Sequence, residues 1–366
     1  MKGLALSSPF RFLKSAPAPG AVTTRSGTVT VLYAAALFVL FSSLFFLAIG
    51  KPPRTVLLGL LEGSFGSGFA LSETLVRAAP ILLCALATAL PARLGLISVG
   101  AEGQLVIGAI TGTGFVLWAG DRAGMLTLPG MLLFGAAGGA AWGAFAGALR
   151  VRFRANETIA TLLLNYIAPP LVDYLVYGPW KDPNSLGWPA TVTFPDAARL
   201  AGHFGTRVHA GLLLGVVLVL GGYAFLARSR IGLAWDLLRE SPALASRAGL
   251  RFGPAVIAAL ALGGAFAGGA GIIEASALEA RLQAGVGAGA GYAGFLVAFL
   301  ARGQLLRILP LTLVVAGLVS AGDNLQLSFD LPSSVVFVLQ GALFAAALIA
   351  SGRGHGPGAE RPAEVR

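Results

Sequence analysis

The sequence is short of charged residues, of histidine and above all of cysteine. Only 11% of its 366 residues are charged, against about 25% in soluble domains, and this difference excludes an ordinary soluble globular protein. The single cysteine, Cys84, excludes an intrachain disulfide. Three histidines and this cysteine do not occur at the spacing of metal ligands. We therefore expect neither a metal nor another cofactor.

Two signatures of enzymes are also missing. The only Gly-Lys pair, Gly50 and Lys51, is followed by Pro52 rather than by serine or threonine, so the chain has no ATP-binding loop. No nucleophile–base arrangement is recognisable either. We expect no enzymatic activity and no ATPase site in this chain.

Long apolar segments fill most of the chain. The hydrophobic fraction of 56% and the mean hydropathy of +0.80 predict an all-α integral membrane protein, because a membrane helix needs about 20 mostly apolar residues. Ten segments come close to this length, and the eighth and ninth are the weakest. The ten segments are 28–50, 73–92, 99–119, 125–149, 158–178, 208–227, 252–273, 286–301, 306–322 and 333–351.

The basic residues predict the orientation of these segments. The net charge of +10 is dispersed between apolar blocks, which is typical of membrane topology rather than of a nucleic-acid-binding surface. If the N-terminus is cytoplasmic and all ten segments cross the bilayer, 18 of the 26 basic residues lie on the cytoplasmic side. The sequence therefore predicts that both termini are cytoplasmic.

Three regions follow from this pattern. Residues 1–27 form a basic leader without acidic residues, and the apolar run at 26–50 is too long for a cleavable signal peptide. Residues 28–351 form the polytopic membrane domain. Residues 352–366 are rich in glycine, proline and charge, and we expect them to be a disordered cytoplasmic tail.

The stretch Leu94–Ala109 interrupts the apolar pattern. Its middle contains three polar side chains among three glycines, in the order Gly95, Ser98, Gly100, Glu102, Gly103 and Gln104. An ionisable side chain at the centre of a membrane helix costs about 2.5–3.5 kcal/mol, and irregular backbone occurs at membrane depth only where it is buried or lines a wet cavity. Two interpretations are equally favoured. The glycines break a helix on a transport path, or the stretch is a cytoplasmic turn with Glu102 as a solvated first-turn residue.

This stretch also resembles a family signature. Residues 79–84 (Ala-Pro-Ile-Leu-Leu-Cys) and 94–104 (Leu-Gly-Leu-Ile-Ser-Val-Gly-Ala-Glu-Gly-Gln) are similar to permease subunits of ABC importers for nucleosides and simple sugars. These permeases are related to those for ribose and branched-chain amino acids. The family usually has Asn-Ile where this chain has Ser98-Val99, which leaves the solute open. Further similar segments lie at 155–166, 232–249, 264–271 and 291–302.

The resemblance implies translocation of a small polar solute, a nucleoside first and a sugar next, across a bacterial inner membrane. It implies a separate ATP-binding subunit, an extracytoplasmic solute-binding protein and a second permease subunit, more often a different chain than a copy of this one. No nucleic-acid partner is expected. The alternatives are an ion-coupled secondary carrier, whose ionisable candidates are Glu102, Asp173 and Arg77, and a polytopic scaffold protein.

The residues expected on the solute path are polar. They are Ser98, Glu102, Gln104, Asn165 and Tyr166. Asn165 lies deep in an apolar segment, where a buried amide needs partners, whereas Asn156 and Glu157 suit the start of a helix. Gly264, Gly268 and Gly271 recur at helical spacing, which favours close helix packing.

A second group of residues is expected to couple this chain to the ATPase, as the resemblance implies. A short cytoplasmic helix would be capped by Ser241, would begin at Pro242, and would allow close approach through its small residues. The coupling residues are Arg239, Glu240, Ser241, Ala245, Ala248 and Gly249.

Overall fold

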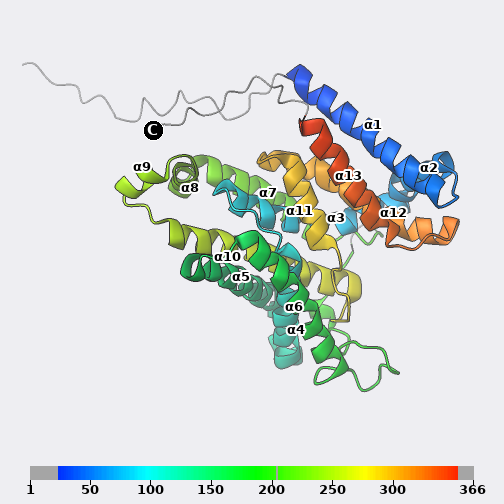
Figure 1. Ribbon diagram of the computed structural model, residues 1–366. Coiled ribbons are helices and arrows are strands. Elements are labelled where there is room, and N and C mark those ends of the chain that lie inside the picture. The colour runs from blue at the N-terminus through cyan, green and yellow to red at the C-terminus, as the bar shows by residue number, and fades with distance from the viewer. Residues whose placement is uncertain (1–23, 203–204, 353–366) are drawn as a thin grey trace, which may run out of the picture.

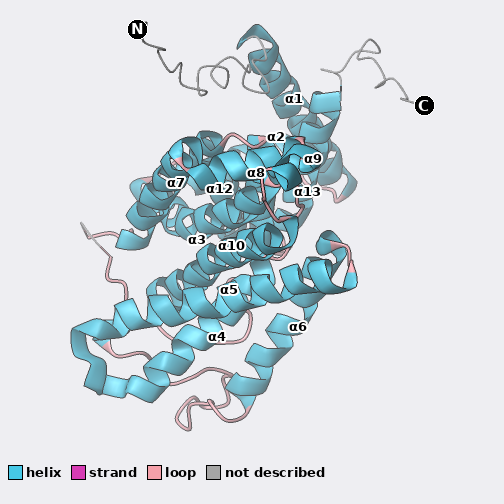
Figure 2. Ribbon diagram, turned by 90° about the vertical axis from the view of Figure 1, so that its left-hand side faces the viewer, coloured by secondary structure: helices cyan, strands magenta, loops and turns pink. Residues whose placement is uncertain are grey.

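The computed structural model describes residues 24–202 and 205–352. Their regular structure is helical throughout (Figures 1 and 2), so the all-α fold class is confirmed. Most of the predicted leader at 1–27 and nearly all of the predicted tail at 352–366 lie outside the described residues.

Each of the ten predicted segments contains a helix. The α-helices are α1 (Thr24–Ala48), α2 (Pro53–Phe65), α3 (Gly68–Arg93), α4 (Ala101–Ala119), α5 (Thr127–Phe153), α6 (Glu157–Tyr177), α7 (Ala210–Arg228), α8 (Arg230–Glu240), α9 (Pro242–Arg247), α10 (Phe252–Ile273), α11 (Ala290–Ala301), α12 (Ile308–Phe329) and α13 (Val335–Gly352). Among the described residues, seven helices are long and apolar enough to cross a membrane, namely α1, α3, α5, α6, α7, α10 and α12. The number of ten spans stays a prediction.

Helix α11 is one reason why fewer than ten helices are long enough to cross a membrane. It has 12 residues and is therefore about 18 Å long, whereas the hydrocarbon core of a bilayer is about 30 Å thick. It begins at Ala290 inside the protein, where Gly291 is buried. We therefore describe α11 as a half-length helix whose N-terminus lies in the interior.

Helix α3 is at the centre of the fold. Of its apolar window, 78% is buried, and α7, α10, α11 and α12 all pack against it. Helix α1 is peripheral: only 11% of its window is buried, and it lies beside α13 at the edge of the molecule (Figure 1). A helix that is apolar all round suits either environment, the core or the lipid.

Glycines bring α5 and α10 into close contact. A Cβ atom added at Gly264 would lie 2.1 Å from the carbonyl oxygen of Gly139, and one at Gly268 would lie 2.2 Å from that of Gly135. Gly271 approaches α4 in the same way, 2.1 Å from the carbonyl oxygen of Leu105. The packing role predicted from the helical spacing of these glycines is confirmed.

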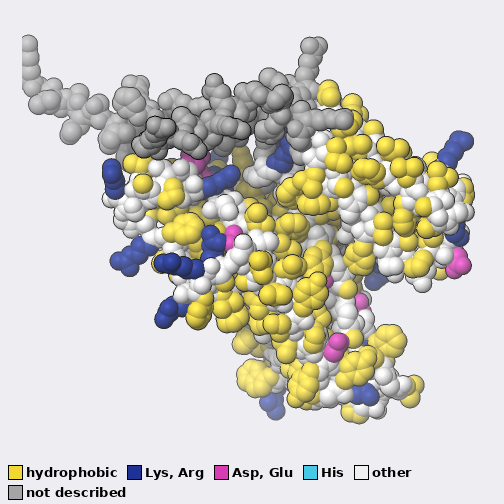
Figure 3. All heavy atoms as spheres, viewed as in Figure 1, with side chains coloured by type: hydrophobic (Ala, Val, Ile, Leu, Met, Phe, Trp, Pro, Cys, Tyr) yellow, Lys and Arg dark blue, Asp and Glu magenta, His cyan; other side chains and the backbone are white. Residues whose placement is uncertain are grey.

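The two ends of the molecule differ in charge and structure. Helices α8 and α9 lie at one end, and the loop that follows α6 lies at the opposite end (Figures 1 and 2). In Figure 3, arginine and lysine side chains gather around the α8–α9 end, while the middle of the molecule is covered by hydrophobic side chains. Arg150 and Arg152 in the last turn of α5 belong to the charged end, as do Arg239 and Arg247 at the ends of α8 and α9.

Candidate solute path and coupling site

An irregular segment separates α3 from α4, as the sequence predicts. It covers residues 94–100, between Arg93 and Ala101. Only Gly95 has a positive φ, of +78°, a conformation that residues with a Cβ atom rarely adopt. Gly100 has a negative φ and Gly103 lies inside α4. The prediction that all three glycines break the helix is therefore wrong for Gly103, whereas Gly100 is the last residue of the break.

Gly100 and Gly103 instead allow α6 to approach. A Cβ atom at Gly103 would lie 3.0 Å from Asn165 Oδ1, and one at Gly100 would lie 3.0 Å from Thr161 Cβ. Both distances are tighter than ordinary side-chain contacts. Larger residues at these two positions would push α6 away from the irregular segment.

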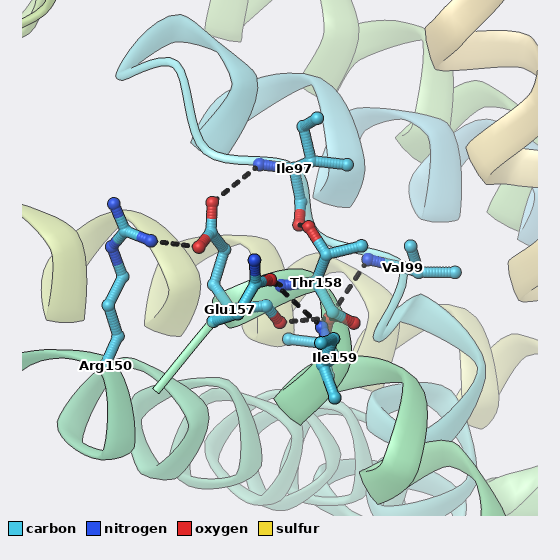
Figure 4. A network of polar contacts seen from close by, with 8 residues as sticks. Ile97, Val99, Arg150, Glu157, Thr158 and Ile159 are labelled. Carbon is cyan, nitrogen blue, oxygen red and sulfur yellow. Dashed lines mark hydrogen bonds and ion pairs between the residues drawn. The ribbon is translucent and has the colours of Figure 1, made fainter. Parts of the chain in front are cut away.

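Hydroxyl groups on the first turns of α6 bind the backbone of the irregular segment (Figure 4). Thr158 Oγ1 donates a hydrogen bond to the carbonyl oxygen of Ile97 at 3.0 Å. The backbone N–H of Val99 donates to Thr161 Oγ1 at 3.2 Å. These bonds replace those that a continuous helix would make, because backbone polar groups buried in a membrane protein need partners.

Asn165 continues this row of polar residues one turn further along α6. Its Nδ2 donates to the carbonyl oxygen of Val99 at 2.8 Å, and its Oδ1 accepts the backbone N–H of Gly103 at 2.9 Å. The side chain is 3% exposed. The prediction that this buried amide finds partners is confirmed, and the partners are backbone groups of the irregular segment and of α4.

The start of α6 connects a third helix to the same segment. Asn156 caps α6, because its Oδ1 accepts two backbone N–H groups of the first turn, at 2.9 and 3.3 Å, as predicted. The Glu157 carboxylate pairs with Arg150 of α5 and also accepts the N–H of Ile97 at 3.4 Å. Figure 4 shows both contacts of Glu157. Glu157 therefore not only complements the helix dipole but also connects α5 to Ile97 of the irregular segment.

Glu102 joins α4 to the interior N-terminus of α11. Its Oε1 accepts the N–H of Gly289 at 2.7 Å, and its Oε2 accepts the N–H of Gly291 at 2.8 Å. The first N–H groups of a helix have no partner within the helix, and a carboxylate there also complements the helix dipole. Glu102 is 6% exposed, so the interpretation as a solvated first-turn residue is wrong.

The segment predicted to couple this chain to the ATPase lies in two short helices, α8 and α9. Helix α9 begins at Pro242, as predicted, but the Ser241 side chain makes no cap hydrogen bond, so the predicted role of Ser241 as a side-chain cap is wrong. At the other end, the N–H of Leu250 bonds to the carbonyl oxygen of Ala245 at 2.9 Å, and Gly249 has φ +78°. This is the glycine-ended turn that terminates many helices.

Comparison with known proteins assigns the chain to a family. Residues 70–348 match the family described as the branched-chain amino acid transport system permease component. The chain belongs to this family. The matched range includes the irregular segment, α6, α8 and α9, so the resemblance drawn from the sequence motifs is confirmed.

Named relatives of this permease are transport proteins as well. It is 33% identical over 285 residues, 75% of this chain and 74% of the relative, to the glucose ABC transporter permease protein TsgB13 of Haloferax volcanii. It is 26% identical, over 76% of this chain and 81% of the relative, to the guanosine ABC transporter permease protein NupP of Bacillus subtilis. A putative glucose permease of Haloferax volcanii, TsgC13, is 29% identical over 72% and 78% of the two chains. No solved structure matches this permease.

The predicted path residues of the permease fall into two groups. Ser98 and Gln104 are buried, 3% and 2% exposed, beside Glu102 and Asn165. Tyr166, by contrast, is 69% exposed on the surface of α6. The structure therefore gathers four of the five residues around the irregular segment and leaves Tyr166 outside this cluster.

The predicted coupling residues also divide into exposed and buried ones. Arg239, Glu240, Ala248 and Gly249 are exposed. Ala245 is fully buried in the hydrophobic core of the permease. Because none of its surface is accessible, the prediction that Ala245 contacts the ATP-binding subunit needs correction. Leu244, which is 55% exposed, is the apolar side chain that α9 presents.

One further contact, between α3 and α8, was not predicted from the sequence. Arg93, the last residue of α3, binds Asp236 of α8 through two parallel contacts, Nε to Oδ1 at 2.7 Å and Nη2 to Oδ2 at 2.8 Å. Two parallel contacts between a guanidinium and a carboxylate fix the relative orientation of the two side chains and also stabilise the pair. They join α8 directly to the residue that precedes the irregular segment.

Proposed function

We propose that this permease is the membrane subunit of an ATP-driven importer of a small uncharged solute, a nucleoside or a simple sugar. The family match over residues 70–348 carries the proposal, and the relatives named for glucose and guanosine transport support the two solute classes. The sequence contains no ATP-binding loop, so a separate ATP-binding subunit supplies the energy.

The ATP-binding subunit docks on the exposed face of α8 and α9. Arg239, Glu240, Leu244, Ala248 and Gly249 offer a mixed polar and apolar surface there. The paired contacts between Arg93 and Asp236 then carry a displacement of α8 to the end of α3. From there the displacement reaches the irregular segment and, through its hydrogen bonds, α6.

The solute passes beside the irregular segment. Amide and hydroxyl groups suit an uncharged hydroxylated solute better than charged clamps do. Because Glu102 and Asn165 already bind backbone groups, we assign them the role of holding the path in shape. We assign Ser98 and Gln104, which are buried beside the irregular segment, and Tyr166, which is exposed on α6, to the path as well.

The α8–α9 end is cytoplasmic, with ten crossings and both termini on that side. The arginines at this end support this orientation. On the other side, the loop after α6 receives the solute-binding protein. The second permease is a different chain, as the two similar Haloferax volcanii permeases support. The complex lies in the bacterial inner membrane.

Reconstitution of the permease with its partner subunits in proteoliposomes tests this function. We expect uptake of radiolabelled guanosine or glucose that requires ATP and the binding protein and is insensitive to ionophores. Uptake that collapses with an ion gradient and persists without ATP would instead favour a secondary carrier, and uptake of neither solute would contradict the proposal.

Impermeant thiol labelling tests the orientation separately. In a Cys84→Ser background, a cysteine at Arg239 should react only from the cytoplasmic side, and one at Trp188, in the loop after α6, only from the external side. External labelling at position 239 would overturn the topology.

A further inference from the structure

A cavity of about 310 Å³ lies apart from the irregular segment. It is enclosed by α3, α12, α13, the residues that precede α11 and a π-helical turn, η4 (Glu274–Glu279), that continues α10. Five polar side chains line it, together with several apolar ones. The polar residues are Arg77, Glu274, Asp323, Ser333 and Gln340, and the apolar ones include Ile81, Val319 and Phe337.

Two of the five polar side chains are paired with each other. Arg77 Nη2 lies 2.7 Å from Asp323 Oδ2, whereas Arg77 Nε is buried and has no hydrogen-bond partner among the described residues. The ion pair neutralises most of the charge that α3 and α12 bring to the cavity. What remains are hydrogen-bonding groups that the protein itself does not satisfy.

Glu274 and Gln340 face the same cavity. Among the described residues neither side chain makes a hydrogen bond or an ion pair, although Gln340 is only 8% exposed; Glu274 does lie within the electrostatic influence of Arg77. Buried polar groups in proteins are almost always hydrogen-bonded, and an ionisable residue within a membrane segment is a functional candidate by default. A carboxyl and an amide that face one cavity without a hydrogen bond from the protein indicate a site that a ligand completes.

We propose that this cavity binds the transported solute, and that the solute is an uncharged molecule with several N–H or O–H donors. Glu274 accepts such donors, Gln340 donates and accepts, and Phe337 and Ile81 cover an apolar ring face. The volume falls within the range of small-molecule sites. This inference rests on the proposed function and adds to it a binding site distinct from the path at the irregular segment.

The site is also connected to the rest of the mechanism. Gly289, which lines the cavity, donates its N–H to Glu102. Glu102 lies directly after the irregular segment, which Arg93 connects to the coupling helices. Displacement of α8 therefore reaches the wall of the cavity, so that occupancy and ATP use become linked.

Protection from thiol labelling tests the site without transport. In a Cys84→Ser background, Ser333→Cys places a thiol at the exposed edge of the cavity in the complete complex in nanodiscs. We expect guanosine or glucose to slow alkylation of this thiol severalfold, and Glu274→Gln to remove the protection. Glu279→Gln, in the same η4 turn but outside the cavity lining, is the matched control and should leave protection intact.

Transport kinetics give the second readout. We expect Glu274→Gln to raise the KM for uptake about tenfold or more, the effect of losing a hydrogen bond to a charged group, with kcat and the thermal midpoint of the complex unchanged. Unchanged KM and unchanged protection in Glu274→Gln would overturn the site and leave the proposed function standing. If the wild-type complex imports neither solute, the proposed function fails, and absence of protection by both probes then overturns the site as well.

Discussion

The contact between Glu102 and the start of α11 gives the sharpest prediction about how the irregular segment is held. Glu102→Gln keeps the size and shape of the side chain but leaves one acceptor oxygen for two backbone N–H groups. The amide nitrogen of the new side chain then faces the N–H of Gly289 or of Gly291. We expect the start of α11 to loosen while the rest of the fold stays intact.

The size of the effect follows from the geometry. Glutamine loses one of two hydrogen bonds to a charged acceptor, about 1.5–3 kcal/mol, and the favourable charge at a helix N-terminus, about 0.3–1 kcal/mol. Because Glu102 is 6% exposed, solvent screens these interactions little. The combined loss is about 2–4 kcal/mol, equivalent to roughly 30- to 900-fold in an opening equilibrium.

Hydrogen exchange measured by mass spectrometry on the purified permease tests this number. We expect peptides that contain residues 289–291 to exchange faster by about that factor in Glu102→Gln, and ATP-driven uptake to fall. Glu102→Leu, which leaves both N–H groups unpaired, should have a larger effect. Glu62→Gln on the exposed side of α2 is the control and should change neither. Unchanged exchange at 289–291 in Glu102→Gln would refute the assigned role.

Three other outcomes are expected. Asp236→Asn should reduce uptake but not the ATPase activity of the assembled complex, because it weakens the contact with Arg93. The double variant that exchanges the charges, Arg93→Asp with Asp236→Arg, should recover part of the uptake. Equal loss of uptake in the single and double variants would count against a coupling role. Leu244→Asp should weaken binding of the ATP-binding subunit in a pull-down without lowering the thermal midpoint, since Leu244 is exposed; normal binding would move the docking surface elsewhere. Ala245→Trp should destabilise the permease itself, by about 1–3 kcal/mol or more, because Ala245 is fully buried; a stable variant would contradict its burial.

The class of the protein and the position of its helices follow from local features of the sequence. Apolar length is a local property, so all ten predicted segments contain helices whose bounds are close to the predicted ones. The irregular segment was also visible locally, because a carboxylate and an amide beside three glycines do not suit a lipid-facing helix. The cap at Asn156 and the glycine contacts of α10 followed from spacing for the same reason.

Contacts between residues that lie far apart in the chain depend on how the helices pack. Spacing would pair Asp236 with Arg239, three residues later on the same helix, but the fold pairs it with Arg93. Similarly, Glu102 suits the first turn of its own helix, and only the packing of α11 reveals that its carboxylate caps a helix that begins almost 190 residues later. The hydrogen-bonding capacity of a side chain is written in the sequence, whereas the group that satisfies it depends on which backbone the fold brings within about 3 Å.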